Sequence, residues 1–458
     1  MNNITAAAMM PHPPIILPNI GKGEEKAIAD IDEAMKTAAK TLLDTDPDAI
    51  VIISPHAPAY FDYIQVSNTP HLRGDMGQFG DYADSFDFEG DLELAAEIDR
   101  LCQQEGLPAG TYAANHATLD HGTMVPMYYL KDGMKGRKLV RISIGGPNAR
   151  THYQLGTIIA KAARNLGKKV AVIGSGDLSH GQKAGTHYGY KPEGPAYDAR
   201  IMDIMGKGDF LDLVEIPEAE SEEAMVCGQK PFAVMAGTMD GLKPTSKALA
   251  HSAEFGVGYG ICTYTDMVPD DARNILEQAE KADQKAYDKK TASEDEYVAV
   301  ARNTINNFIT YGKVKKPADL PEGPGACFVS IHKDGQLRGC IGTTEPTTDN
   351  LASEIMQNAI SASTRDPRFP AVQPWELEDL DINVDVLSPA EAISSPSELD
   401  PKKYGVIVTK GSKRGLLLPD LEGVDTVKKQ LEIAKQKAGI SPDDSNVSLE
   451  RFTVVRHK

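Results

Sequence analysis

Residues 49–58 read Ala-Ile-Val-Ile-Ile-Ser-Pro-His-Ala-Pro and contain the run that decides the fold of the first half of the chain. Five consecutive apolar residues, rich in β-branched Ile and Val, predict a strand. Because the run shows no polar alternation, we expect its sheet to be covered by helices on both faces. The histidine of this stretch, His56, therefore follows directly on the end of a buried strand.

Similar short apolar runs recur through the first 265 residues and alternate with longer amphipathic stretches. This alternation is typical of α/β architecture. The expected strands are Ile4–Met10, Ala49–Ser54, Ile64–Asn68, Leu139–Ile144, Val170–Ile173 and Val257–Tyr264, and the clearest helices are Glu24–Leu43 and Leu92–Gln104. We therefore predict a first domain over residues 1–265 with a sheet between helical layers.

The composition of the sequence changes after residue 265. The next stretch is highly charged with few large apolar residues, which predicts a solvated linker helix over 266–284. Beyond it, Asp334-Gly335 between two strand-like runs predicts a hairpin. The strand-like runs of this half are Ala326–His332, Gln336–Gly342, Asp381–Leu387, Tyr404–Val408 and Gly415–Leu418. We predict a smaller α+β domain over 285–458.

Composition restricts the class of function. The 458 residues carry 48 Lys+Arg against 66 Asp+Glu, a net charge of −18, which argues against nucleic acid or an anionic membrane as the main partner. No run approaches the ~18 apolar residues of a membrane span, and the N-terminal run lacks the features of a signal peptide. Five cysteines without a CxxC pair exclude a disulfide framework and a thiolate zinc site of the usual spacing. We expect a cytoplasmic protein.

Three histidines follow predicted strands. His12 and His56 come directly after theirs, and His180 comes a few residues after a third. Ligands of open α/β sheets bind outside the carboxyl ends of the strands, so we expect these imidazoles at one rim. Prolines beside His12 and His56 restrict the backbone there. Imidazole is a frequent metal ligand, so the pattern predicts a metal site, while His152 and His187 are expected on the surface.

A carboxylate beside two histidines would complete a ferrous site with open positions. Glu254, ahead of a glycine-rich strand in His251-Ser-Ala-Glu-Phe-Gly-Val-Gly-Tyr-Gly260, is the best candidate, although periodicity alone does not select it from 66 acidic residues. The same ligand types also serve zinc, which leaves a hydrolase as an alternative.

Five motifs in order carry a resemblance to a known family. They are MPHPPIILP around His12, SPHAP around His56, LDHGTMVPMYYL around His121, GDLSHG around His180 and HSAEFGVGYG around Glu254. In this order they resemble the class III extradiol dioxygenases of LigB type and, more narrowly, the Memo family. The resemblance runs through the whole first domain and implies a three-layer sheet domain.

The resemblance also implies roles. His12, His56 and Glu254 would be ligands of Fe(II), with zinc and copper left open. His180 would be the general base that deprotonates a catecholic hydroxyl, and His121 a second acid/base or oxygen-orienting group. The implied activity is that of a non-haem Fe(II) oxidoreductase that uses O2 on a small phenolic or heteroaromatic compound. From the residues alone, His180 could instead support another ligand, and Asp-His-Gly at 120–122 could equally be a structural turn.

Cys227 begins a Cys-Gly-Gln-Lys-Pro segment that resembles a CGxxP segment of the Memo family, which lies near the pocket. Memo proteins of higher organisms commonly carry cysteine as the third ligand, but Glu254 matches the dioxygenases instead. As a lone free cysteine, Cys227 is expected to be buried and inert.

In the second half, Leu337-Arg-Gly-Cys-Ile-Gly342, together with Ser363-Thr-Arg-Asp-Pro-Arg-Phe369, resembles the AMMECR domain family. This resemblance names a fold and no reaction, and Cys340 itself is expected to be a buried cysteine. The two domains on one chain resemble the AmmeMemoRadiSam arrangement. That implies a separate radical S-adenosylmethionine partner, and an alternative function in which the chain is a metal-binding scaffold that docks this partner without turnover of its own.

Overall fold

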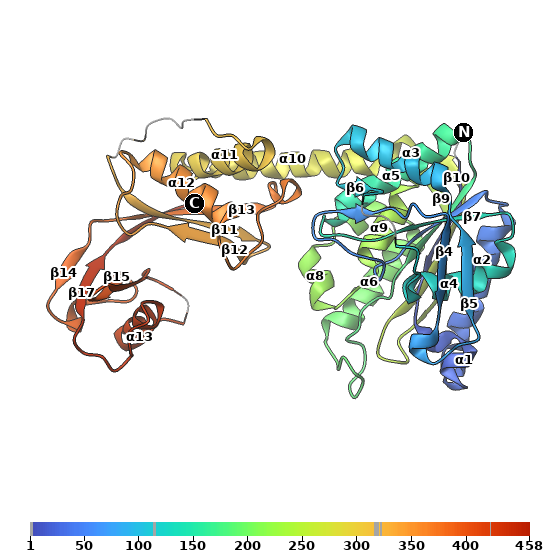
Figure 1. Ribbon diagram of the computed structural model, residues 1–458, viewed down its shortest axis with the longest axis horizontal. Helices are drawn as coiled ribbons and strands as arrows, with labels where there is room; N and C mark the ends of the chain where they lie inside the picture. Colours follow the sequence, from blue (N-terminus) through green and yellow to red (C-terminus); the bar gives the residue numbers. More distant parts are fainter. Residues whose placement is uncertain (1–2, 113–115, 316–319, 321–322, 422) are drawn as a thin grey trace. The chain divides into compact units, whose positions relative to one another are not determined.

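A computed structural model describes residues 3–112, 116–315, 320, 323–421 and 423–458. The chain divides into two compact units, Met1–Asp283 and Gln284–Lys458 (Figure 1). The division falls inside helix α10 (Ile275–Ser293), so the charged helix expected as a linker belongs partly to each unit. None of the helices in the described ranges is long and apolar enough to cross a membrane.

A six-stranded sheet in the order β7-β2-β8-β1-β10-β9 forms the centre of the first unit. The strands β7, β2, β8 and β1 run parallel, β10 is antiparallel to β1, and β9 is antiparallel to β10. The bounds are β1 Ile4–Met10, β2 Ala49–Ile53, β7 Lys138–Ile142, β8 Val170–Ser175, β9 Leu242–Ser252 and β10 Tyr259–Pro269. The expected strands near residues 4, 49, 139, 170 and 257 are present with slightly different ends.

Helices cover both faces of this sheet, as the unbroken apolar strands predict. In β2, Val51 and Ile53 belong to one buried cluster with residues of α3, α5, α6 and α9, whereas Ile50 and Ile52 belong to a second cluster with residues of α2 and α4. Each buried aliphatic side chain contributes about 1.5–3 kcal/mol. The helix bounds are α2 Ala29–Asp44, α3 Leu92–Glu105, α4 His121–Leu130, α5 Ala149–Leu166, α6 Glu193–Lys207 and α9 Gln229–Gly237. The predicted three-layer α/β class is confirmed.

Short elements complete the first unit at its edges and loops. They are α1 Pro18–Gly21, α7 Phe210–Val214, α8 Glu218–Glu223, the paired strands β3 Ile64–Gln65 and β6 Ala109–Gly110, and the paired strands β4 His71–Asp75 and β5 Ser85–Glu89.

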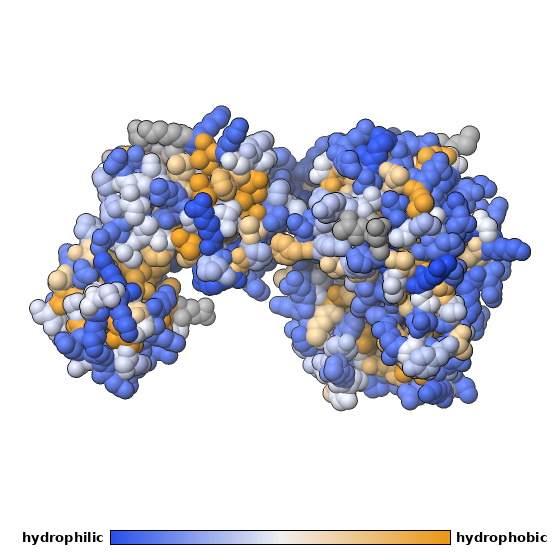
Figure 2. Space-filling model, in the orientation of Figure 1, coloured by the Kyte–Doolittle hydropathy of each residue, from blue (hydrophilic) through white to orange (hydrophobic). Residues whose placement is uncertain are grey.

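The space-filling view shows a mainly hydrophilic surface on the face presented, in keeping with the high charge of the chain (Figure 2).

The second unit contains two antiparallel sheets, β12-β11-β13-β18 and β14-β17-β15-β16. Helices α11 and α12 pack on the first sheet, and α13 packs on the second. The bounds are α11 Glu296–Tyr311, β11 Ala326–Lys333, β12 Gln336–Gly342, α12 Leu351–Thr364, β13 Leu380–Leu387, β14 Glu391–Ile393, β15 Gly405–Lys410, β16 Lys413–Leu417, α13 Val427–Lys437, β17 Ser448–Phe452 and β18 Val454–His457. Asp334 and Gly335 both have positive φ, as a tight hairpin turn requires. The predicted α+β domain is confirmed.

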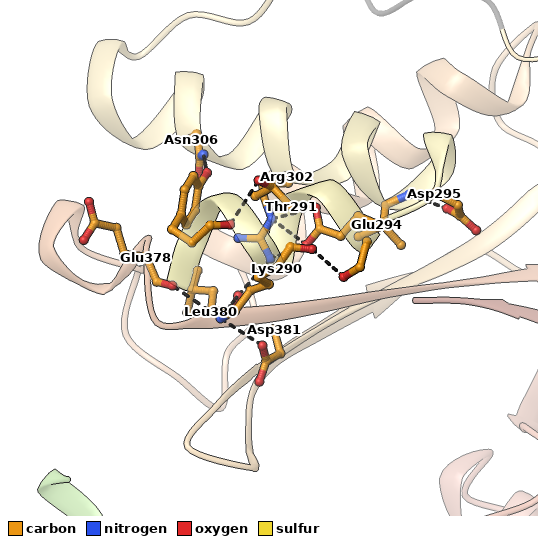
Figure 3. Close-up of polar contacts among 12 residues, drawn as sticks. Lys290, Thr291, Glu294, Asp295, Arg302, Asn306, Glu378, Leu380 and Asp381 are labelled. Atoms are coloured by element: carbon orange, nitrogen blue, oxygen red, sulfur yellow. Dashed lines mark hydrogen bonds and ion pairs between the residues drawn. The ribbon is translucent and has the colours of Figure 1, made fainter. Parts of the chain in front are cut away.

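Within the second unit, polar contacts hold the last turns of α10 against β13 and the residues just before it (Figure 3). The Lys290 ammonium donates to the main-chain carbonyls of Glu378 and Leu380, both at 3.3 Å, and pairs with Asp381 at 3.0 Å. Arg302 on α11 is 3% exposed and forms an ion pair with Glu294, at 2.6 Å between Nη2 and Oε1. A buried guanidinium therefore depends on a carboxylate in the short connection between α10 and α11.

Candidate metal centre

His12 and His56 meet at the carboxyl ends of β1 and β2, where the sequence predicts them. Their Nε2 atoms lie 3.1 Å apart. On its other side, His12 Nδ1 lies 2.9 Å from the hydroxyl of Ser175, which itself donates to the carbonyl of Gly122 at 2.5 Å. Because that hydroxyl hydrogen is engaged, the serine oxygen accepts the Nδ1–H of His12. The lone pair of His12 Nε2 then faces His56.

Cys227 supplies the third group of this cluster. Its Sγ lies 3.7 Å from His12 Nε2, and it accepts the backbone N–H of Asp177 at 3.2 Å. Within the described residues, His12, His56 and Cys227 form the group whose ligand atoms, all within 4.8 Å of one another, could hold one metal ion. The expectation of an inert cysteine overlooked this contact. The resemblance of its CGQKP segment to the Memo family was the available signal.

Glu254 lies elsewhere. It sits in the turn between β9 and β10, where its side chain is 52% exposed and its Oε1 accepts from the Lys183 ammonium at 3.1 Å. The same ammonium donates to the Glu254 carbonyl at 3.1 Å. The structure therefore does not bring Glu254 to the two histidines, and Cys227 is the third potential ligand beside them.

His121 and His180 flank the three groups. His121 is the first residue of α4, with its ring centroid 4.1 Å from that of His56 and 5.5 Å from that of His12. His180 lies in the loop after β8, with its ring 4.9 Å from that of Tyr188. Its Nδ1 is buried and has no hydrogen-bond partner among the described residues. The rim predicted from sequence thus gathers all four histidines.

Burial sets the protonation state of these imidazoles, since it disfavours a charged ring. It lowers the pKa of His12 well below its usual value, and the neighbouring imidazoles lower it further. Burial also lowers the pKa of His56 and His180, and lowers the pKa of His121 to about 4. Near neutral pH the four rings are therefore uncharged, the form in which imidazole binds metals and accepts protons.

The start of α4 is tied to the strand that precedes His56. Asp120 caps the helix by accepting the Thr123 N–H at 3.0 Å, and it also accepts the hydroxyl of Ser54. That hydroxyl accepts the His56 N–H at 3.3 Å. A Cβ at Gly122 would collide with the Ser54 hydroxyl, so a larger residue would disturb the hydrogen bond between Ser54 and Asp120. Asp-His-Gly is thus a structural turn that also presents His121 to the site.

Asp177 is a buried group that the sequence reasoning missed. Its Oδ1 accepts the backbone N–H of His12 at 2.8 Å, and its Oδ2 lies 3.9 Å from His12 Nε2. Burial raises the pKa of Asp177 to about 7. Its place three residues before His180, in the same motif, was the signal that could have identified it.

The three donor groups fit a metal ion. In zinc sites each nitrogen ligand lies about 2.0–2.1 Å from the ion. The separation between two such nitrogens is close to the 3.1 Å between His12 Nε2 and His56 Nε2. Burial raises the pKa of the Cys227 thiol above its usual value, so a metal must displace the thiol proton when it binds. Two neutral imidazoles and a thiol that ionises on binding form a donor set of ordinary chemistry for a transition metal.

His152 is not on the surface, and the expectation that it is proves wrong. It is fully buried on α5, with Nδ1 2.9 Å from the Asn148 carbonyl and Nε2 accepting the Gly145 N–H at 3.3 Å. Leu155 and Ile159 follow at helical spacing on the same buried face, a signal that could have shown its orientation. Burial lowers the pKa of His152 to about 3.

This buried imidazole makes the first unit sensitive to acid. The unfolded chain binds a proton at His152 below pH about 6.5 and the folded chain only near pH 3, so stability falls as pH drops through that window. From pH 7 to 5 the loss from this group is about 2 kcal/mol. Urea unfolding of the metal-free chain at both pH values measures the loss of unfolding free energy. In His152→Gln this loss should be smaller than in the wild type by this amount. Exposed His187→Gln should behave like the wild type, and equal losses in all three proteins would contradict the prediction.

Comparisons with known proteins agree with this two-part organisation. Residues 6–262 match the family described as the catalytic LigB subunit of aromatic ring-opening dioxygenase, and residues 298–457 match AMMECR1. A Clostridium acetobutylicum protein, CA_C1420, is 37% identical, and the match covers 98% of each chain. A Thermotoga maritima protein is 57% identical over 171 residues, which are 36% of this chain and 98% of the relative.

Two solved structures are also similar. The crystal structure of the uncharacterized protein PH0010 from Pyrococcus horikoshii is 31% identical and covers 35% of this chain and 88% of its own, with a TM-score of 0.33. That of the uncharacterized Escherichia coli protein JW3007 is 16% identical and covers 57% and 99%, with a TM-score of 0.40. With a family match over more than half of its length, the chain belongs to the family of the catalytic LigB subunit of aromatic ring-opening dioxygenase, and it carries an AMMECR1 domain in its second half.

Proposed function

We propose that the first unit is a metal-dependent oxidoreductase of extradiol dioxygenase type that acts on a small phenolic or heteroaromatic compound. One observation carries the proposal: His12, His56 and Cys227 converge on one point, with two further uncharged histidines beside them. Three protein ligands leave coordination positions open, as a catalytic metal site requires. The family match is the second support.

The ligands in this proposal are His12 Nε2, His56 Nε2 and Cys227 Sγ, and the metal is Fe(II). Ferrous iron would supply open positions at which substrate and O2 bind side by side. A sulfur ligand also suits zinc and Cu(I), so the choice of metal is decided by analysis of the purified protein.

His180 is the general base of the proposal. Its ring lies at the site, and burial lowers its pKa, so near neutral pH it is an uncharged imidazole that can accept a hydroxyl proton. His121 is the weaker base because its pKa lies near 4. Phe79 and Tyr188 place aromatic rings against His121 and His180 and give the substrate apolar walls. General base catalysis contributes about 10²–10⁴-fold.

Zinc hydrolysis is the second candidate, and the sulfur ligand is the observation that favours it. Two histidines and a cysteine would bind zinc, whose remaining position holds a water that the metal makes acidic. In this alternative His180 would accept the proton of that water.

The test is purification without oxygen, metal analysis, and O2 uptake with a panel of catechols and a matched panel of aliphatic diols. We expect iron near one equivalent and uptake with catechols that incorporates both atoms of ¹⁸O2 into a ring-opened product. His180→Gln should keep its metal and lose turnover by about 10²–10⁴-fold. Stoichiometric zinc with no O2 consumption would overturn the proposal in favour of the hydrolase.

A further inference from the structure

The segment that carries His180 is held by a buried carboxylate from another part of the unit. Asp198 on α6 is 1% exposed, and its Oδ1 accepts the backbone N–H of Ser179 at 2.9 Å. Its Oδ2 accepts from His251 Nε2 at 2.9 Å, at the end of β9. The carboxylate thus fastens the peptide next to His180 to a helix, and a partly exposed histidine holds the carboxylate in place.

The strand end at Gly258 completes this support. The Leu178 N–H donates to the Gly258 carbonyl, and the Gly258 N–H donates to the Ser179 carbonyl, both at 2.8 Å. A Cβ at Gly258 would collide with the Asp198 carboxylate, so the glycine lets the carboxylate reach the loop. The backbone immediately before His180 is therefore held from two directions, while the His180 N–H donates to the Ala224 carbonyl at 3.2 Å.

We infer that Asp198 is a positioning residue for His180, and that His251 orients the Asp198 carboxylate for this task. Catalytic groups must be held in place by the contacts of their supporting residues. The inference rests on the proposed function for the role of His180, but its geometry does not depend on turnover. Asp198 acts through the backbone of Ser179 and has no proposed contact with substrate or metal.

A purely structural role is the alternative, because any buried hydrogen-bonded carboxylate stabilises its surroundings. Asp240 provides the matched control. Its Oδ1 accepts from the Tyr153 hydroxyl at 2.9 Å and from the Ile275 N–H at 2.8 Å. It lines a cavity beside Asn3, at the end of β1 opposite to His12. Loss of Asp240 should destabilise the unit without an effect on His180.

The experiment uses the full chain and needs no substrate. In metal-free protein with labelled histidine, the His180 ring resonance is assigned with His180→Gln and followed by NMR together with exchange of the Ser179 amide. Asp198→Ala should shift the His180 resonance and raise Ser179 exchange at least about 10-fold, since the amide loses its acceptor. Asp198→Asn keeps an oxygen at the same place and should restore both. Asp240→Ala should leave both readouts unchanged.

Zn²⁺ alone serves as the metal probe. Because the three ligands are untouched, Asp198→Ala should bind Zn²⁺ within about 3-fold of wild type, a shift of less than one kcal/mol. If Asp198→Ala does not fold, His251→Ala provides a milder variant, in which the His180 resonance should shift less but in the same direction. An unchanged His180 resonance in a folded Asp198 or His251 variant, or an equal shift in Asp240→Ala, would overturn the inference. A shift in a chain that never consumes O2 would refute the proposed function and leave the positioning intact.

Discussion

Replacing Cys227 by alanine should remove the metal from the first unit, whereas the same change at Glu254 should leave metal content unchanged. Cys227 Sγ shares the point at which His12 and His56 converge, while Glu254 is half-exposed and paired with Lys183. Changes in the residues that merely support metal ligands cost 10–100-fold in affinity, so loss of a ligand should cost at least about 100-fold. Competition with a chelator of known affinity measures this value.

A matched control for the loss of a buried thiol is Cys102→Ala on α3, since Cys102 is fully buried in the same unit. This variant should bind metal as the wild type does. Metal retained in Cys227→Ala and lost in Glu254→Ala would contradict the geometry and would restore the carboxylate as the third ligand. It would also mean that the turn carrying Glu254 moves when metal binds.

Replacing Glu294 by alanine should destabilise the second unit by about 3–5 kcal/mol. Arg302 is 3% exposed and the Glu294 side chain 8%, so removal of the carboxylate leaves a buried guanidinium without its counter-charge. One kcal/mol corresponds to roughly 2–4 °C for a unit of this size, which predicts a fall of roughly 6–20 °C in the melting temperature. Trp375 is the single tryptophan of the chain and lies in this unit, so its fluorescence reports the transition.

Asp425→Ala is the control in the same unit. Its ion pair with Lys402 joins two exposed side chains, and such pairs contribute about 0–1 kcal/mol. This variant should melt within a few degrees of the wild type. Equal falls in melting temperature in the two variants would show that burial of the Arg302–Glu294 pair does not determine its contribution to stability.

Much of the architecture can be read from local sequence because it depends on local chemistry. Apolar runs such as residues 49–53 form central strands wherever helices cover them, and Asp334-Gly335 adopts positive φ values that few other pairs tolerate. The location of the histidines follows from the same logic, since His12 and His56 come directly after parallel strands whose ends meet at one rim.

The third member of the candidate metal site was decided only by tertiary structure. Cys227 lies 215 residues from His12 in the chain, and its Sγ reaches the site because α9 packs beneath the sheet and places the preceding turn at the rim. Glu254 stands in a family-like motif, yet the turn that carries it presents its carboxylate to Lys183 and solvent. Asp198 likewise reaches the His180 loop only through the packing of α6. Strand ends and turns depend on neighbours in the chain, so the sequence alone could place His12 and His56. Which side chains then meet across the rim depends on how distant helices pack, and no local pattern records that.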